Sequence, residues 1–292
     1  MTPLMAVPNV SEGRDPEVLE AIGRAFASNP PVRLLDRHAD PDHHRAVYTL
    51  AGPPGQLALA LLAGARQAVS AIDLDTPRGI HPHVGAIDVV PVVHLDPTLR
   101  GAAVVEALLT ADLLAGELGL PVFLYGVLAG GRTRAELRRG GAPELWRRVL
   151  AGELQPDFGP HRPHPRAGAV LVGARPPLVA FNLELAPPAG LDTARRIAAA
   201  IRHGGSDGLP GVRAIGLALA ARGGRAQVSV NVEDADAVPL AAVVRAVSRH
   251  APLAAAELVG LAPRAAFHGF PDDLPLAGFD PARHIIENVL AG

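Results

Sequence analysis

The sequence has no cysteine and no lysine among its 292 residues, and only 3% of its residues are aromatic. The absence of cysteine excludes disulfides and thiol catalysis. With few aromatic residues and a net charge of −2, the chain offers neither a stacking platform nor a basic stripe, so we expect no nucleic-acid partner. The absence of lysine is typical of a GC-rich genome and indicates little about function.

Long apolar segments are also missing. No stretch of about 18 apolar residues occurs, although 49% of the residues are hydrophobic, so the sequence predicts no transmembrane helix and no membrane partner. Residues 1–9 are too short and too weakly charged for a signal peptide. We therefore expect a soluble, cytoplasmic protein that acts on small molecules and is large enough for two compact units.

The spacing of apolar residues predicts the order β-α-β-β-α-β in each half of the chain. In the first half the elements are expected at residues 4–7, 17–27 (a helix capped by Asp15), 32–36, 45–51, 57–69 and 86–93. In the second half they are expected at residues 178–185, 193–203 (a helix behind Asp192 as cap), 212–219, 226–232, 240–251 and 256–259. This order predicts an α/β (α+β) protein of two ferredoxin-like subdomains, residues 1–174 and 175–292, whose sheets face a shared crevice.

Between the two repeats the pattern predicts a helix over residues 99–119, a strand over 122–125 and two short helical pieces that end near Leu150. Residues 156–168 are too rich in proline and glycine for regular structure, and we interpret them as a linker or a binding loop. Arginines 132, 134, 138, 139, 147 and 148 are expected to form a solvated helix face, and Trp146 is expected to serve packing.

Three polar clusters, distant in sequence, are expected to meet at one edge of the first sheet. They are Asn9, Ser11 and Glu12 after the first strand, His38, Asp40, Asp42, His43 and His44 in the hairpin, and His81 and His83 before the fourth strand. Because histidine titrates near neutrality, His81 is the first candidate for proton transfer. A His-x-His metal site, completed by a hairpin histidine, is a weaker alternative.

Short motifs spread over nearly the whole chain resemble the glutamate formimidoyltransferase (formiminotransferase) family, as its formiminotransferase domain alone without a cyclodeaminase domain. The matching pieces are residues 7–13, 34–36, Arg45 with 47–49, 52–54, 81–82, 85–86 with Asp88, 121–122 with 124–126, 156–160, 173–175, 180–182, 226–229 with Asn231, and 258–261. The resemblance implies a homodimer that moves a formimino group from N-formimino-L-glutamate to N5 of tetrahydrofolate, the co-substrate, without a metal.

The resemblance also implies roles for individual residues. The family's catalytic base, the histidine of its His-Pro motif, maps to His81, and a group with a pKa near 7 can both accept and return the proton that the transfer requires. The family's folate-binding stretch maps to residues 159–168, where two arginines would pair with folate carboxylates. The residues expected to bind folate or substrate are Gly159, Pro160, His161, Arg162, Pro163, His164, Pro165, Arg166, Ala167 and Gly168, with Asn9, Ser11, His38, Arg45, His83, Arg175 and Asn182.

The sequence departs from the family pattern at four positions. The family commonly has an aspartate at His38, an arginine or similar residue at His83, a glutamate at Val127 and an aromatic residue at Ala167. Loss of two acidic groups changes how a cationic formimidinium is held. Three alternatives therefore stay open: a donor such as 5-formyltetrahydrofolate, a histidine-metal hydrolase and a non-catalytic folate binder.

Overall fold

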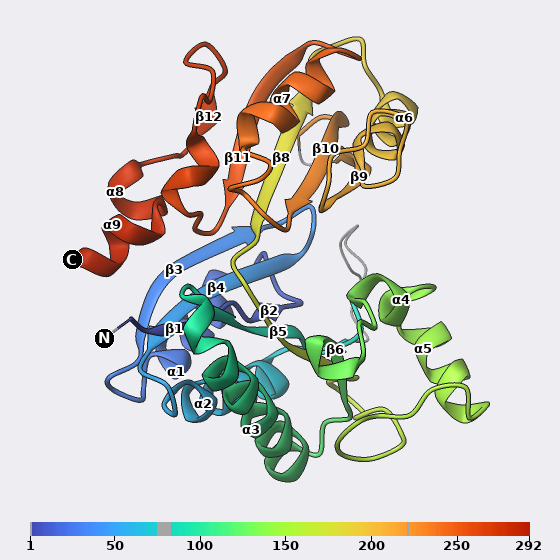
Figure 1. Ribbon diagram of the computed structural model, residues 1–292. Coiled ribbons are helices and arrows are strands. Elements are labelled where there is room, and N and C mark those ends of the chain that lie inside the picture. The colour runs from blue at the N-terminus through green and yellow to red at the C-terminus, as the bar shows by residue number, and fades with distance from the viewer. Residues whose placement is uncertain (1, 75–82, 221) are drawn as a thin grey trace. The chain divides into compact units, whose positions relative to one another are not determined.

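The structure, a computed structural model, describes residues 2–74, 83–220 and 222–292 (Figure 1). The chain divides into two compact units, Met1–Pro176 and Pro177–Gly292, which we call the first and the second unit. Both contain helices packed on a sheet, so the predicted α/β class is confirmed. In the described part of the chain, no helix is both long and apolar enough to cross a membrane.

The first unit is built on a mixed sheet that is longer than the sequence predicts. Its strands are β1 (Leu4–Ala6), β2 (Asn9–Val10), β3 (Arg33–Asp40), β4 (Arg45–Gly52), β5 (Ile87–His94), β6 (Val122–Gly126) and β7 (Val170–Arg175). Its helices are α1 (Pro16–Phe26), α2 (Leu57–Ala71), α3 (Arg100–Leu118), α4 (Arg134–Arg138) and α5 (Gly141–Leu150), with short 3₁₀ turns η1 (Pro97–Leu99) and η2 (Val127–Ala129).

Two strands of this sheet were not predicted: Asn9 and Val10, expected to follow the first strand, form β2, and residues 170–175 form β7. β1 and β2 lie between β4 and β5 and run antiparallel to both, β3 pairs with the far side of β4, and β7 lies between β5 and β6, parallel to each. We expected no strand at Val170–Arg175. A parallel strand covered on both faces shows no alternation of polar and apolar residues, and β7 is buried over nearly its whole length.

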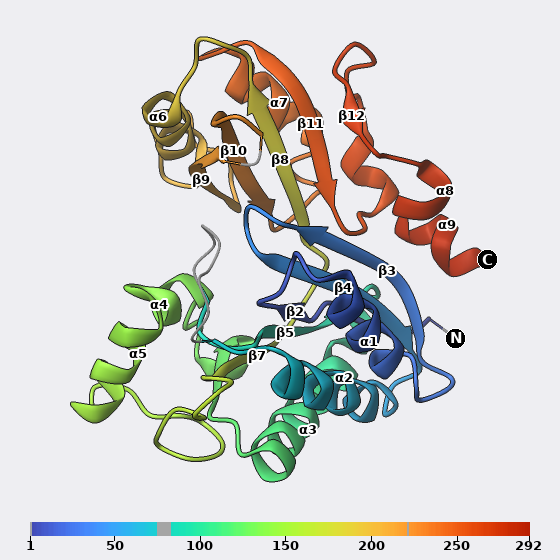
Figure 2. The ribbon, with the colours of Figure 1, turned by 180° about the vertical axis from the view of Figure 1, so that it is seen from behind.

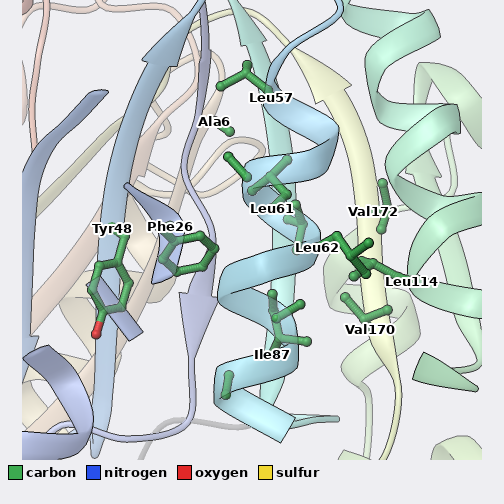
Figure 3. Close-up of a cluster of buried hydrophobic side chains, with 14 of the residues drawn as sticks. Ala6, Phe26, Tyr48, Leu57, Leu61, Leu62, Ile87, Leu114, Val170 and Val172 are labelled. Carbon is green, nitrogen blue, oxygen red and sulfur yellow. The ribbon is translucent and has the colours of Figure 1, made fainter. Parts of the chain in front are cut away.

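Two clusters of apolar side chains cover the two faces of the first sheet. Helices α1, α2 and α3 pack on one face, where Phe26, Leu61 and Val172 meet in the main core (Figure 3). Alternate residues of the same strands point the other way, and there Phe123 packs against Leu145 of α5. Helix α1 begins as predicted, because the Asp15 carboxylate accepts hydrogen bonds from the backbone N–H groups of residues 17 and 18 at 2.9 and 3.1 Å.

As far as residue 259 the second unit follows the predicted element order, and the residues after it form further short elements that we did not predict. Figure 2 shows the ribbon from the reverse side. Its elements are β8 (Val179–Leu185), α6 (Leu191–Ile201), β9 (Val212–Leu219), β10 (Arg225–Val232), α7 (Leu240–Ser248), β11 (Leu253–Val259), η3 (Arg264–Phe267), β12 (Leu276–Ala277), α8 (Pro281–His284) and α9 (Ile286–Ala291). The strands lie in the order β12-β11-β8-β10-β9, and only β12 pairs in parallel. The predicted cap of α6 was wrong: Gly190 is the cap, and Asp192 lies in the first turn.

Candidate functional site

The start of β5 is where segments distant in sequence meet. The Ser11 hydroxyl donates to the Gly85 carbonyl at 2.8 Å, and the Ser11 N–H donates to the Ala86 carbonyl at 2.9 Å. On the other side, the Ala86 N–H donates to the Ala167 carbonyl at 2.9 Å. The end of β2, the chain that leads into β5 and the end of the segment 156–168 are therefore joined by backbone hydrogen bonds.

Close backbone packing at this junction requires glycine. Gly168 has φ +67°, and a Cβ there would lie 2.3 Å from the Val84 carbonyl oxygen. The side chain of Ala167 is fully buried in the main core. Ala167 and Gly168 thus fix the backbone at the end of the predicted folate loop. A ligand would contact the residues that precede them in the sequence. His161, Arg162 and Arg166 are exposed.

The β3–β4 turn packs against the end of β2, as the sequence predicts. The Glu12 carboxylate accepts the N–H of Gly13 at 2.8 Å and lies 3.4 Å from Nδ1 of His44. His43 lies 3.0 Å from the Asp40 carboxylate in the same turn.

The position of His38 differs from the prediction. We expected a polar loop over residues 37–44, but β3 continues to Asp40, so His38 is a half-buried strand residue. An edge strand tolerates such polar residues, because one of its two edges is not covered by a neighbouring strand. His38 and Asn9 both pair with Val47 of β4 and therefore face the same side of the sheet.

Two arginines interact with a buried carboxylate next to this junction, and a third arginine lies near them. The Asp88 side chain is 2% exposed, accepts the Val84 N–H at 2.8 Å and forms an ion pair with Arg138. The pKa of Arg45 is lowered to about 9, first by burial and then by the nearby charges of Arg138 and Arg134, whereas Asp88 acts in the opposite direction. We call Arg45, Arg134 and Arg138 the arginine cluster. The three guanidinium groups act electrostatically on one another, and those of Arg45 and Arg138 also interact with Asp88.

The predicted solvated face of arginines is wrong at two positions. The Arg138 side chain is 12% exposed and holds Asp88. Arg132 donates to the Leu124 carbonyl and pairs with Asp157, which itself accepts the Leu124 N–H at 2.7 Å. These partners could not be predicted from the sequence, because the acidic residues lie far along the chain and α4 has only five residues. Trp146 serves packing, as predicted, with its ring centroid 6.1 Å from that of Phe123.

Tyr125 is a further residue of this region that sequence reasoning did not assign a role. Its side chain is 6% exposed, and the Arg134 guanidinium lies 5.7 Å from the ring centroid. The ring lies on Gly173 of β7, where a Cβ would come within 2.6 Å of its Cζ atom. Within the described residues, the phenolic oxygen has no hydrogen-bond partner.

Some predicted site residues are not brought together with the others. Arg175 pairs with Val93, at the opposite end of β5 from Asp88, a separation of about 16 Å along a strand. Asn182 belongs to the second unit, where its amide donates to Glu257 at 3.0 Å. His81, the predicted base, lies outside the described residues, whereas His83 is half-buried.

The helix-free face of the second sheet carries a charged network. Glu184 pairs with Arg222 and accepts from Arg225 at 3.0 Å, and Arg222 also donates to Glu257 at 3.1 Å. Gln227, paired with Glu184 across the strands, is fully buried, and its amide atoms have no partner in the described part of the chain. No group of three or more histidine or acidic side chains with metal-binding geometry occurs among the residues described.

Comparison with known proteins assigns the family. Residues 3–175 match the N-terminal subdomain of the formiminotransferase domain, and residues 180–269 match the formiminotransferase domain. The chain belongs to the formiminotransferase family. The resemblance predicted from the motifs is thereby confirmed, and both halves of the formiminotransferase domain coincide with the two units.

Formiminotransferase relatives differ in how much of their length the chain covers. The glutamate formimidoyltransferase of Streptococcus pyogenes serotype M1 is 34% identical over 98% of both chains. That of Thermoplasma acidophilum is 36% identical over 69% of this chain and 68% of its own. The formimidoyltransferase-cyclodeaminase of Gallus gallus is 38% identical over 89% of this chain and 50% of its own. The chain spans about half the length of this last relative and of the similar proteins from other animals.

Proposed function

We propose that this formiminotransferase moves a formimino group from N-formimino-L-glutamate to N5 of tetrahydrofolate, which is a co-substrate. The observation that carries the proposal is the match along 98% of both chains to a relative named glutamate formimidoyltransferase. The arginine cluster supports it, because the donor bears two carboxylates and guanidinium groups bind carboxylates with two parallel hydrogen bonds.

The reaction needs a group that moves protons twice. Attack of folate N5 on the formimidoyl carbon forms a tetrahedral adduct, after which the attacking nitrogen loses a proton and the departing glutamate nitrogen gains one. We assign both transfers to His81, since an imidazole can accept and donate a proton near pH 7. Asn9, Ser11, His38, His83 and Arg45 are proposed to bind the substrates around it. No step of this chemistry requires a metal.

The segment 159–168 is proposed to bind folate. Arg162 and Arg166 are exposed and would pair with the carboxylates of the folate glutamate. Burial and the neighbouring Arg166 lower the pKa of His164, whose Nδ1 accepts the Ala167 N–H at 3.0 Å. A neutral imidazole thus keeps the turn closed without adding a further positive charge.

We also propose the finer features of the assembly. Each unit is a ferredoxin-like subdomain, which the strand order within each sheet supports. The boundary expected between residues 174 and 175 lies within β7, so we place it between Pro176 and Pro177, where the two units divide. The chain forms a homodimer, supported by an exposed apolar face on α3 that includes Val105. A cytoplasmic location fits the small-molecule substrates.

A transfer assay tests the proposed function. Purified protein with formiminoglutamate and tetrahydrofolate is expected to release glutamate and form 5-formiminotetrahydrofolate, and His81→Ala is expected to lower kcat at least about a hundredfold without a change in Tm. His83→Ala, the matched control, should cost less. Turnover of 5-formyltetrahydrofolate without any turnover of formiminoglutamate would contradict the proposed donor. Equal losses in both variants, with wild-type activity dependent on added zinc, would favour a metal hydrolase.

A further inference from the structure

The two tyrosines of the chain are both buried, but among the described residues only the Tyr48 hydroxyl finds a hydrogen-bond partner. The Tyr48 hydroxyl donates to the Leu19 carbonyl at 2.8 Å, and its ring packs beside Phe26 (Figure 3). The Tyr125 hydroxyl has no partner in the described part of the chain. Buried hydroxyl groups are almost always hydrogen-bonded, and an unsatisfied one destabilises the folded state. The Tyr125 hydroxyl therefore indicates a hydrogen-bond partner from outside the described chain, such as a bound ligand.

The surroundings of Tyr125 show what kind of partner fits. Gly173 lets the ring lie directly on β7, because any larger residue would collide with it. The Arg134 guanidinium lies 5.7 Å from the ring centroid, and Arg134 and Arg138 both raise the positive potential around Arg45. A phenol donates one hydrogen bond, and arginines donate several but accept none. A ligand that satisfies both must be an anion with oxygen acceptors.

We propose that Tyr125 is a specificity-determining residue, whose hydroxyl donates to a carboxylate oxygen of the substrate glutamate that the arginine cluster binds. The inference rests on the proposed function for the identity of the anion. A carboxylate has about four acceptor positions on two oxygens, so it can accept from the phenol and from a guanidinium together. A carboxamide at the same place would present an N–H group to arginines and a phenol that donate hydrogen bonds, and it would carry no negative charge toward the guanidinium groups.

The proposal predicts that stability and binding respond oppositely to one substitution. Tyr125→Phe removes a hydroxyl that has no partner in the free protein, so Tm should stay unchanged or rise. The same substitution removes a charge-assisted hydrogen bond from the complex, so Kd should rise at least about tenfold. Tyr48→Phe is the matched control. It removes a hydroxyl that is satisfied inside the protein, so Tm should fall while Kd stays constant.

The experiment uses the full chain and L-glutamate as the probe, without folate. Isothermal titration calorimetry gives Kd for L-glutamate, L-glutamine and L-isoglutamine, and thermal unfolding gives Tm for the wild type, Tyr125→Phe and Tyr48→Phe. We expect the wild type to discriminate against one of the two amides and Tyr125→Phe to lose most of that discrimination. The two amides show whether the contacted carboxylate is on the side chain or on the α-carbon.

Several results would overturn the inference. An unchanged Kd in Tyr125→Phe, whatever its Tm, would mean that water satisfies the hydroxyl or that its site is not at the ligand. Absence of L-glutamate binding by the wild type would also reject it. Formimino transfer by the wild type with an unaltered KM in Tyr125→Phe would reject the inference and leave the proposed function standing. If Tyr125→Phe lost affinity for L-glutamate but the wild type carried out no formimino transfer, the proposed function would be rejected and the Tyr125 contact would stand.

Discussion

At the residue scale, the pair formed by Arg138 and Asp88 is the most consequential charge interaction next to the candidate site. Both side chains are largely shielded from water, with 12% and 2% of their surface exposed. Removing one partner of a buried ion pair leaves an uncompensated charge and costs about 3–5 kcal/mol. The same Arg138 orients Asp88, whose other oxygen accepts the Val84 N–H and so holds the backbone just after His83.

Arg138→Met is therefore expected to lower the free energy of unfolding by about 3–5 kcal/mol, measured by urea denaturation without ligand. Adding Asp88→Asn should restore much of this loss, because the amide oxygen still accepts the Val84 N–H and no charge is left buried. Arg147→Met is the control, since Arg147 is exposed and pairs with Glu144 and Glu153 at the surface. A loss in Arg138→Met no larger than in this control would contradict the argument.

At the scale of helices and strands, elements with a clear apolar period and a local cap could be predicted. Helix α1 starts at the predicted cap Asp15, and β9 has the predicted bounds Val212–Leu219. Prediction failed where partners distant in sequence determine the structure. β7 is a strand because β5 and β6 enclose it, and β3 extends because β4 pairs with it as far as Asp40. Neither cause is visible within a local sequence window.

The same limit applies to the candidate site. The convergence of Ser11, the β3–β4 turn and the chain before β5 followed from the element order, which depends on local patterns. The arginine cluster did not, since its members come from β4 and α4 and are arranged around a carboxylate of β5. The role of Tyr125 was hidden for another reason: a missing hydrogen bond is a property of the folded chain alone.

The network on the second sheet predicts a pH dependence of stability. Burial raises the pKa of the Glu184 carboxyl, but hydrogen bonds from Arg222 and Arg225 outweigh it and leave the pKa below its ordinary value of 4.5. The charged form is thus favoured by folding. Its contribution is fully present above pH 4.5 and is lost as the pH falls through the lower pKa of the folded state.

We expect the Tm of the wild type to fall between pH 6 and pH 3, and Glu184→Gln to fall less steeply over that interval. The slope is the readout, because the substitution can also change Tm by an amount that does not depend on pH. Asp192→Asn is the control: Asp192 is 97% exposed and lies 3.8 Å from Arg195. Parallel slopes for Glu184→Gln and the wild type would show that this carboxylate does not contribute.

At the scale of the whole molecule, an apolar surface on the first unit is the feature that a single chain leaves unexplained. Helices α2 and α3 lie side by side on one face of the first sheet (Figure 1). On α3, Val105, Leu108 and Leu109 are 66, 36 and 42% exposed, and their spacing of three and four residues places them on one side of the helix. Leu59 of α2 is 54% exposed. Clustered exposed apolar residues are typical of protein interfaces, whereas scattered ones are not.

The homodimer proposed above gives this surface an occupant, namely the same helices of a second chain related by a twofold axis. Sedimentation velocity at micromolar concentration should show a dimer for the wild type and a monomer for the double variant Val105→Glu/Leu109→Glu, because each charge would be buried without a partner. Leu150→Glu is the matched control, since Leu150 on α5 is 82% exposed but belongs to no such cluster. A monomeric wild type would reject the dimer. If the double variant still formed a dimer, the dimer interface would not include the apolar face of α3, and that face would need another partner.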